Sequence, residues 1–138
     1  MPFQISWESR GVYRTYVGHL TDAERRRSLE LITSDRRFVD LKYSITDFLG
    51  ITRFVEEPQV TQELAALHIV PLWTNTRLIM AAVAVDPVHL EYIRRFKEVG
   101  AVEAPYEVFP TLEAARRWIA EQTGIPVARQ CPTSPDKS

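Results

Sequence analysis

Alternating apolar and polar residues predict three strands in the first third of the chain. Phe3–Glu8 has the period of a half-buried strand, Ser9–Gly11 offers a turn, and Val12–Gly18 completes a hairpin. The same alternation over Val39–Phe48 predicts a third strand that ends at Asp47 or Phe48. A glycine-containing loop over Asp47–Phe54 is expected to follow it.

A long uncharged run predicts the centre of the sheet. Leu78–Val85 contains no charge and no alternation, which is typical of a strand covered on both faces within a parallel sheet. It is the best candidate for the central strand. A short last strand is predicted over Tyr106–Phe109.

Helix start and stop signals predict four helices. A hydroxyl or aspartate cap, or a proline in the first turn, suits a helix start because the first backbone amides have no partner within the helix. Glycine favours the end of a helix. The predicted helices run from Thr21 to about Asp35, from Pro58 to Pro71, from Asp86 to Gly100 and from Thr111 to Gly124.

Strands and helices therefore alternate after an initial hairpin. This order predicts an α/β fold, because helices between parallel strands must cross over the sheet. We expect a single domain over residues 1–124, with a mixed β-sheet of about five strands flanked by about four helices. The first hairpin is its only obligatory antiparallel pair. Residues 125–138 are predicted to form a disordered tail.

Composition and charge exclude several classes of protein. The chain has 17 Lys and Arg against 18 Asp and Glu, so it lacks the positive field that sequence-independent nucleic-acid binding needs. No window approaches the roughly 18 uncharged apolar residues of a membrane span, and the N-terminus does not resemble an export signal. Cys131 is the only cysteine, which excludes an internal disulfide. We expect a cytoplasmic protein.

The sequence lacks the motifs of common catalytic and cofactor sites. His19, His68 and His89 have no zinc-type partner four residues later. There is no G-x-S-x-G nucleophile elbow, and the glycines form no G-x-G-x-x-G loop. We therefore expect no catalytic residues, no metal and no cofactor, so that the protein is not an enzyme.

The end of the third strand is the main candidate site. In an open α/β sheet, functional groups gather beyond the carboxyl ends of the strands. If the strands that end near Asp47 and Asp86 are neighbours, six polar or small residues share one edge of the molecule. They are Thr46, Asp47, Gly50, Thr52, Arg53 and Asp86. The alternative is structural, with Asp86 as a helix cap and Asp47 as a loop cap.

Two further segments have alternative interpretations. Arg25–Arg27 with Arg36 and Arg37 is the one basic cluster, predicted to be a solvated face and alternatively a docking surface for an acidic partner. The apolar stretch Leu67–Trp73 is either a buried helix end or, through Leu67, Leu72 and Trp73, the wall of an apolar pocket or a dimer patch.

The chain resembles the STAS superfamily, and within it the bacterial SpoIIAA-like proteins. The resemblance covers roughly Phe3–Gln122 and is carried by four segments of pattern-level similarity. These are GHLT at Gly18–Thr21, ITDF at Ile45–Phe48, AVAVD at Ala82–Asp86 and VFPTLEAARRWI at Val108–Ile119.

The resemblance implies a regulatory site after the third strand. Anti-sigma-factor antagonists of this superfamily carry an Asp-Ser-Ser-Gly-like phosphoacceptor motif at the start of the helix that follows. Here the segment reads DFLGITRF, so Asp47 matches the acid while the serine and the glycine have no match. Thr52 is the nearest hydroxyl and is the candidate substitute phosphoacceptor.

Two functions follow as expectations. The first is a non-enzymatic regulatory or protein-interaction module, similar to STAS domains, that binds a protein partner through the loop after the third strand. The second is a carrier of a small apolar ligand or lipid in a pocket near the second helix, since the lipid-carrying CRAL-TRIO domains are similar in fold to SpoIIAA-like proteins.

Overall fold

Five strands form one mixed sheet whose spatial order follows the chain. The computed structural model describes residues 3–54, 57–67, 75, 77–98 and 105–124. The strands are β1 (Phe3–Glu8), β2 (Gly11–Leu20), β3 (Tyr43–Phe54), β4 (Ile79–Val83) and β5 (Tyr106–Phe109), in the order β1-β2-β3-β4-β5. β1 pairs antiparallel with β2, and every later neighbour is parallel. The predicted mixed sheet with an antiparallel first hairpin is confirmed.

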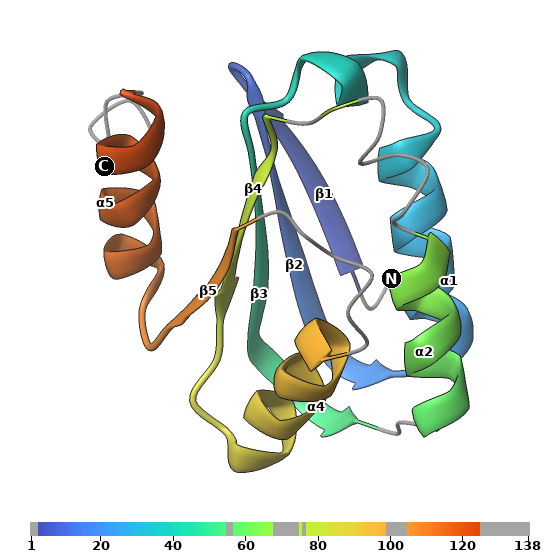
Figure 1. The fold of residues 1–138 in the computed structure, drawn as a ribbon. Coiled ribbons are helices and arrows are strands. Elements are labelled where there is room, and N and C mark those ends of the chain that lie inside the picture. The colour runs from blue at the N-terminus through green and yellow to red at the C-terminus, as the bar shows by residue number, and fades with distance from the viewer. Residues whose placement is uncertain (1–2, 55–56, 68–74, 76, 99–104, 125–138) are drawn as a thin grey trace.

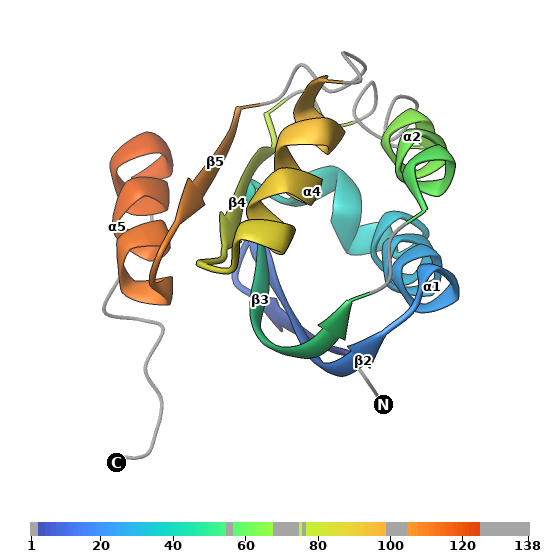
Figure 2. The same ribbon diagram turned by 90° about the horizontal axis from the view of Figure 1, so that it is seen from below.

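The helices cover the two faces of the sheet unequally. They are α1 (Asp22–Thr33), the 3₁₀ helix η1 (Arg36–Asp40), α2 (Pro58–Leu67), α4 (Pro87–Glu98) and α5 (Leu112–Thr123). Figures 1 and 2 show α1, α2 and α4 on one face and α5 on the other. Crossovers between neighbouring parallel strands are right-handed, which places every connecting helix on the same face. α5 follows the last described strand and so connects no pair of described strands, and it lies on the opposite face.

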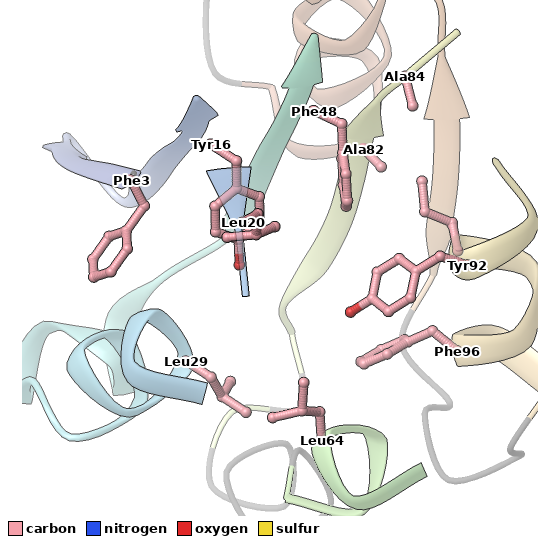
Figure 3. Packing of buried hydrophobic residues seen from close by; sticks show 11 residues of the cluster. Phe3, Tyr16, Leu20, Leu29, Phe48, Leu64, Ala82, Ala84, Tyr92 and Phe96 are labelled. Carbon is pink, nitrogen blue, oxygen red and sulfur yellow. The ribbon is translucent and has the colours of Figure 1, made fainter. Parts of the chain in front are cut away.

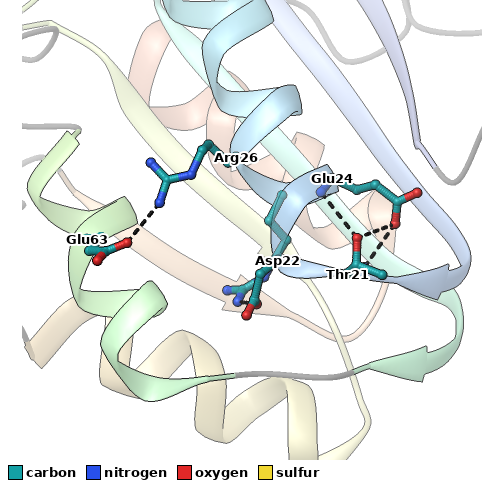
Figure 4. Close-up of polar contacts among 6 residues, drawn as sticks. Thr21, Asp22, Glu24, Arg26 and Glu63 are labelled. Atoms are coloured by element: carbon teal, nitrogen blue, oxygen red, sulfur yellow. Dashed lines mark hydrogen bonds and ion pairs between the residues drawn. The ribbon is translucent and has the colours of Figure 1, made fainter.

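The predicted caps at Thr21, Thr111 and Gly124 are confirmed, while the predicted helix ends at Pro71 and Gly100 lie outside the described residues. Thr21 and Glu24 form the capping box of α1, in which each side chain bonds the other residue's backbone amide (Figure 4). Thr111 caps α5 by accepting from the amide of Ala114. Gly124 closes α5 with a φ of 79°, a left-handed conformation that glycine adopts without steric cost.

Three apolar clusters of described residues form the core. The largest lies under α1, α2 and α4 and includes Leu29, Phe48, Leu64 and Tyr92 (Figure 3). A second packs α5 against β3 and β4 through residues such as Ile119. A third joins α1 and η1 to the sheet through residues such as Phe38. β4 is buried along its whole length, as the uncharged run predicts. The middle position of the sheet, however, belongs to β3.

The predicted start of the third strand is wrong. Val39 lies in η1 and is exposed, and β3 begins only at Tyr43. Asp35 caps η1 by accepting from the amide of Arg37, at 2.9 Å. The buried side-chain amide of Asn75 donates to the carbonyls of Phe38 and Leu41, both at 2.8 Å. These contacts satisfy the amide of Arg37 and the carbonyls of Phe38 and Leu41 without strand pairing, so the apolar alternation does not produce a strand here.

The basic cluster was predicted to be a solvated face, and this prediction is wrong for Arg25. This side chain is only 2% exposed, and its guanidinium lies 4.9 Å from the ring centre of Tyr92 and 5.5 Å from that of Phe54. It forms an ion pair with Asp22. Arg26 does lie at the surface, where it pairs with Glu63 of α2 at 2.8 Å (Figure 4). The cation–π contacts keep Arg25 buried despite its charge.

Several predictions fall outside the described residues. They are the tail 125–138, His68, and the segment that contains Leu72 and Trp73. Among the residues that the structure does describe, no helix is both long and apolar enough to cross a membrane.

Candidate functional site

The carboxyl ends of β2, β3 and β4 lie at the same edge of the sheet, which we call the carboxyl edge (Figure 1). β3 and β4 are neighbours, with Asp47 opposite Val83. Asp86 follows two residues after Ala84 and begins α4. The structure therefore meets the condition under which Asp47 and Asp86 were expected to share one edge.

The segment predicted as a loop is a strand. Asp47–Phe54 continues β3 and pairs with β2 as far as Leu20. The register shifts twice along this stretch, between Thr15 and Val17 and between Gly18 and His19. Such shifts increase the local twist of a strand and bend it. Gly50 therefore lies in an irregular strand pair, and residues after Asp47 form a strand in place of the expected loop.

Asp47 is buried and its carboxylate is occupied. Oδ2 accepts a hydrogen bond from the hydroxyl of Tyr13 at 2.7 Å, and Oδ1 accepts from the amide of Leu49 at 2.9 Å. Burial raises the pKa of Tyr13 to about 12, and the hydrogen bond to Asp47 adds to the rise. Asp47 therefore stabilises the carboxyl edge through hydrogen bonds within the protein, and its carboxylate is not presented to a partner.

Gly50 is required by a close approach between β2 and β3. A Cβ at this position would lie 2.8 Å from Cγ1 of Val17 and 3.0 Å from the carbonyl oxygen of Tyr16. The carbonyl is backbone and cannot move aside as a side chain can. Gly50 thus permits the irregular pairing that carries the end of β3.

Thr52 and Arg53 are exposed near the end of β3. Arg53 lies opposite His19 of β2 in the register, and both side chains face solvent. Arg53 forms no ion pair with any residue that the structure describes. These two residues therefore expose a hydroxyl and a cation at the carboxyl edge.

Asp86 is a helix cap. Its Oδ1 accepts from the amide of Val88 at 2.8 Å, and its carbonyl accepts from the amide of Leu90 at 3.0 Å. The structural interpretation of Asp86 is confirmed by these bonds. Its side chain is nonetheless exposed at the same edge as Thr52 and Arg53.

The sequence-based interpretation missed an exposed apolar surface at this edge. Val17 is 41% exposed, Leu49 is 49% exposed and Val85 is 57% exposed. Val17 lies on β2, Leu49 lies on β3 and Val85 lies two residues beyond the end of β4. We call these three residues the apolar edge patch. Single exposed apolar residues are common on protein surfaces, whereas large contiguous apolar patches mark interaction sites.

The patch lies beyond the part of the sheet that α5 covers. Tyr13, Ile45 and Val83 belong to or pack against the α5 cluster. Val17, Leu49 and Val85 follow them along the chain toward the carboxyl edge, where the register between β2 and β3 shifts and Val17 pairs with Gly50. A 12-residue helix spans only about 18 Å. The signal in the sequence is that apolar residues, Leu49 and Val85, follow Asp47 and Val83.

The structure does not test the predicted apolar pocket. Leu67 lies at the end of α2 with an exposed side chain, and its predicted pocket partners Leu72 and Trp73 lie outside the described residues. Among the side chains that the structure places, no three His, Cys, Asp or Glu residues lie close enough to hold a metal.

The fold is similar to that of a solved structure of the anti-sigma factor antagonist SpoIIAA in its unphosphorylated form. The two share a TM-score of 0.59 at 14% sequence identity, over 85% of this chain and 96% of that chain. The resemblance in fold that the sequence predicts is thereby confirmed. No family model and no curated protein sequence matches the chain.

Proposed function

We propose that this chain is a non-enzymatic regulatory module that binds a protein partner through the carboxyl edge of the sheet. The observation that carries the proposal is the apolar edge patch, in which Val17 of β2, Leu49 of β3 and Val85 just after β4 are exposed. The cores of protein interfaces bury apolar groups of this kind, while polar groups form the rim. We expect the protein to act in the cytoplasm.

The surroundings of the patch indicate the chemistry of the partner. Thr52 and Arg53 stand exposed beyond Leu49 on the same strand, and Arg53 has no ion pair among the described residues. A partner that covers the patch would therefore present an apolar centre and a carboxylate at the rim, because a guanidinium binds carboxylates with two parallel hydrogen bonds. Asp47 and Gly50 contribute by shaping β3, and Asp86 by capping α4.

The structural neighbour supports the same class of function. SpoIIAA is an anti-sigma factor antagonist, and therefore a regulatory protein that acts on another protein. The solved structure is of its unphosphorylated form. We propose by analogy that phosphorylation of Thr52 regulates partner binding here, since its side chain is exposed and lies next to the candidate contact Arg53. A phosphate at this position would add negative charge where the partner presents an acid.

The test compares partner capture by matched surface variants. Wild-type protein, Leu49→Asp and Val39→Asp are immobilised, and proteins recovered from lysate of the source organism are quantified by mass spectrometry. Val39 is the control because it is equally exposed but lies in η1, before the amino end of β3. We expect a specific protein to be recovered by wild type and Val39→Asp, and reduced at least about tenfold with Leu49→Asp, since a buried unpaired carboxylate is costly.

Equal recovery with all three proteins would overturn the proposal. Circular dichroism of each variant checks that the fold is kept. Arg53→Ala should weaken capture less than Leu49→Asp, because rim charges contribute less than a buried apolar centre. Thr52→Glu should weaken capture while Thr52→Ala should not, and the same behaviour from both variants would remove Thr52 as the regulatory position.

The experiment must also distinguish a partner protein from a second copy of the chain bound at the apolar edge patch. Light scattering during size-exclusion chromatography gives the mass in solution for wild type and Leu49→Asp. A dimer that is lost in Leu49→Asp would assign the patch to self-association and overturn the proposed partner. The apolar carrier pocket at Leu67, Leu72 and Trp73 stays a prediction, because no observation on the described residues favours it.

A further inference from the structure

A cavity lies between the sheet and the layer formed by α1 and η1. Its volume is about 50 Å³. Leu29 and Ile32 of α1, Phe38 of η1 and Met80 of β4 give it an apolar wall. Arg14, Tyr16, Ser44 and Thr46 contribute polar groups from β2 and β3. The cavity thus combines an apolar wall with a permanently charged cation, and it lies apart from the exposed patch at the carboxyl edge.

The guanidinium of Arg14 is held rigidly by two hydroxyl groups. Nη1 donates to Oγ of Ser28 at 3.0 Å, and Nη2 donates to Oγ1 of Thr46 at 2.8 Å. Both hydroxyl residues are buried, and the Ser28 oxygen also lies 2.8 Å from the hydroxyl of Tyr16. The guanidinium carbon lies 5.3 Å from the ring centre of Tyr16. Arg14 is therefore oriented before any ligand arrives, which reduces the entropy lost on binding.

The positive charge of Arg14 has no carboxylate partner among the described residues. Its Nε is buried and donates to no acceptor. An arginine does not lose its proton in proteins, so the charge cannot be removed by titration. A buried donor without an acceptor destabilises the folded protein, and more so when the group is charged. An anion in the cavity would offset this cost.

The size and the walls of the cavity restrict the class of anion. A cavity of about 50 Å³ holds roughly four waters at the 10–15 Å³ that each requires. A carboxylate matches the fork of a guanidinium, and a short hydrocarbon tail matches the apolar wall. A phosphate dianion would bring a second charge, for which the described lining offers no second cation.

We propose that this cavity binds a small monocarboxylate with a short apolar tail, whose carboxylate pairs with Arg14. The half-buried position of Arg14 and Ser44 gives the ligand a route from solvent. The tail packs against Leu29, Ile32 and Phe38. Binding adds an acceptor for Nε and neutralises the one guanidinium of the cavity lining.

The test is a titration of the full chain with sodium propionate, followed by ¹H–¹⁵N NMR spectra. Propanamide, which has the same shape without the charge, and sodium chloride serve as ligand controls. Wild type should show saturable shifts at amides around the cavity, such as those of Ile32 and Thr46. Propanamide should bind at least about tenfold more weakly, since a hydrogen bond to a charged group contributes about 1.5–3 kcal/mol.

Variants separate the site from general anion binding. Arg14→Met removes the charge and keeps the apolar stem, and should weaken propionate binding at least about tenfold. Arg117→Met is the matched control, because Arg117 is exposed on α5, across the sheet, and should bind as wild type does. Ile32→Phe fills the cavity, keeps Arg14 and should abolish binding. The same spectra show whether each variant is folded.

Three results would overturn the proposal. They are the absence of saturable shifts in wild type at millimolar propionate, equal affinity in wild type and Arg14→Met, and shifts spread over the surface that chloride reproduces. In each of these cases the cavity would hold only water.

Discussion

Individual side chains in this protein are placed by contacts that come from distant parts of the chain. His89 of α4 is buried beside Phe48 and Phe54 of β3, with ring centres 5.7 Å and 5.4 Å away. Burial lowers the pKa of His89, and the nearby charge of Asp86 partly opposes this. The histidine is therefore neutral in the folded protein at pH values where an unfolded chain already binds a proton.

The pH dependence of stability follows from this difference in pKa. Below the ordinary histidine pKa of about 6.5, the unfolded state binds more protons than the folded state, so the free energy of unfolding falls as the pH falls. One proton contributes a slope of at most about 1.4 kcal/mol per pH unit. His89→Phe keeps the aromatic packing and should reduce the slope between about pH 7 and pH 5, measured by urea unfolding.

If His89→Phe and wild type lose stability equally on acidification, another group titrates and His89 does not contribute.

The sequence identifies residues whose role depends on near neighbours and misses those whose role depends on the fold. The capping functions of Thr21, Asp86 and Thr111 involve amides two or three residues away, and all three are confirmed. The burial of Arg25 depends on Tyr92, which lies on another helix. No local pattern separates Arg25 from its exposed neighbour Arg26.

At the scale of elements, the start of α1 offers a direct test of local control. Glu24 donates its amide to Oγ1 of Thr21 at 3.3 Å, and its carboxylate accepts from the amide of Thr21 at 3.0 Å. Thr21→Ala removes the hydroxyl and should lower the free energy of unfolding by about 1 kcal/mol. Thr21→Ser retains the hydroxyl and should stay near wild type in urea unfolding. Equal losses in both variants would show that the methyl group matters and the cap does not.

The extent of β3 shows where local patterns mislead. Alternation predicts a strand from Val39, yet η1 occupies that position and β3 instead runs on to Phe54. The capping of η1 by Asp35 and the bonds from Asn75 stabilise η1 where a strand was predicted. Pairing with β2 stabilises the extension of β3 to Phe54, and Gly50 permits the close approach of the two strands. The candidate interaction residues therefore lie on a paired strand, which holds them more rigidly than a loop.

At the scale of the whole molecule, Phe48 connects the sheet to the helical layer. Its side chain is 2% exposed and contacts Tyr16, His89 and Tyr92 with ring centres 5.7–6.0 Å apart. Phe48→Ala should lower the free energy of unfolding by about 3–5 kcal/mol, because it removes buried apolar contacts and leaves a cavity. Far-UV and near-UV circular dichroism should report the same urea transition, since the sheet and its helical layer share this core.

Leu49 provides the matched control in the next position of β3. Leu49→Ala should change the free energy of unfolding by no more than about 0.5 kcal/mol, because this side chain is half exposed and lies outside the core clusters. Similar losses from Phe48→Ala and Leu49→Ala would contradict the assignment of Leu49 to a contact surface and of Phe48 to the core.

The sequence by itself determined the class of the fold, the order of its elements and most of the helix ends. These features depend on periodicity and capping, which act over a few residues. Tertiary structure alone decided that three connecting helices share one face, that α5 leaves Val17, Leu49 and Val85 uncovered, and that Arg14 faces a cavity without a carboxylate partner among the described residues. The physical reason is that exposure and charge pairing depend on which distant segments pack together, and a local pattern does not contain that information.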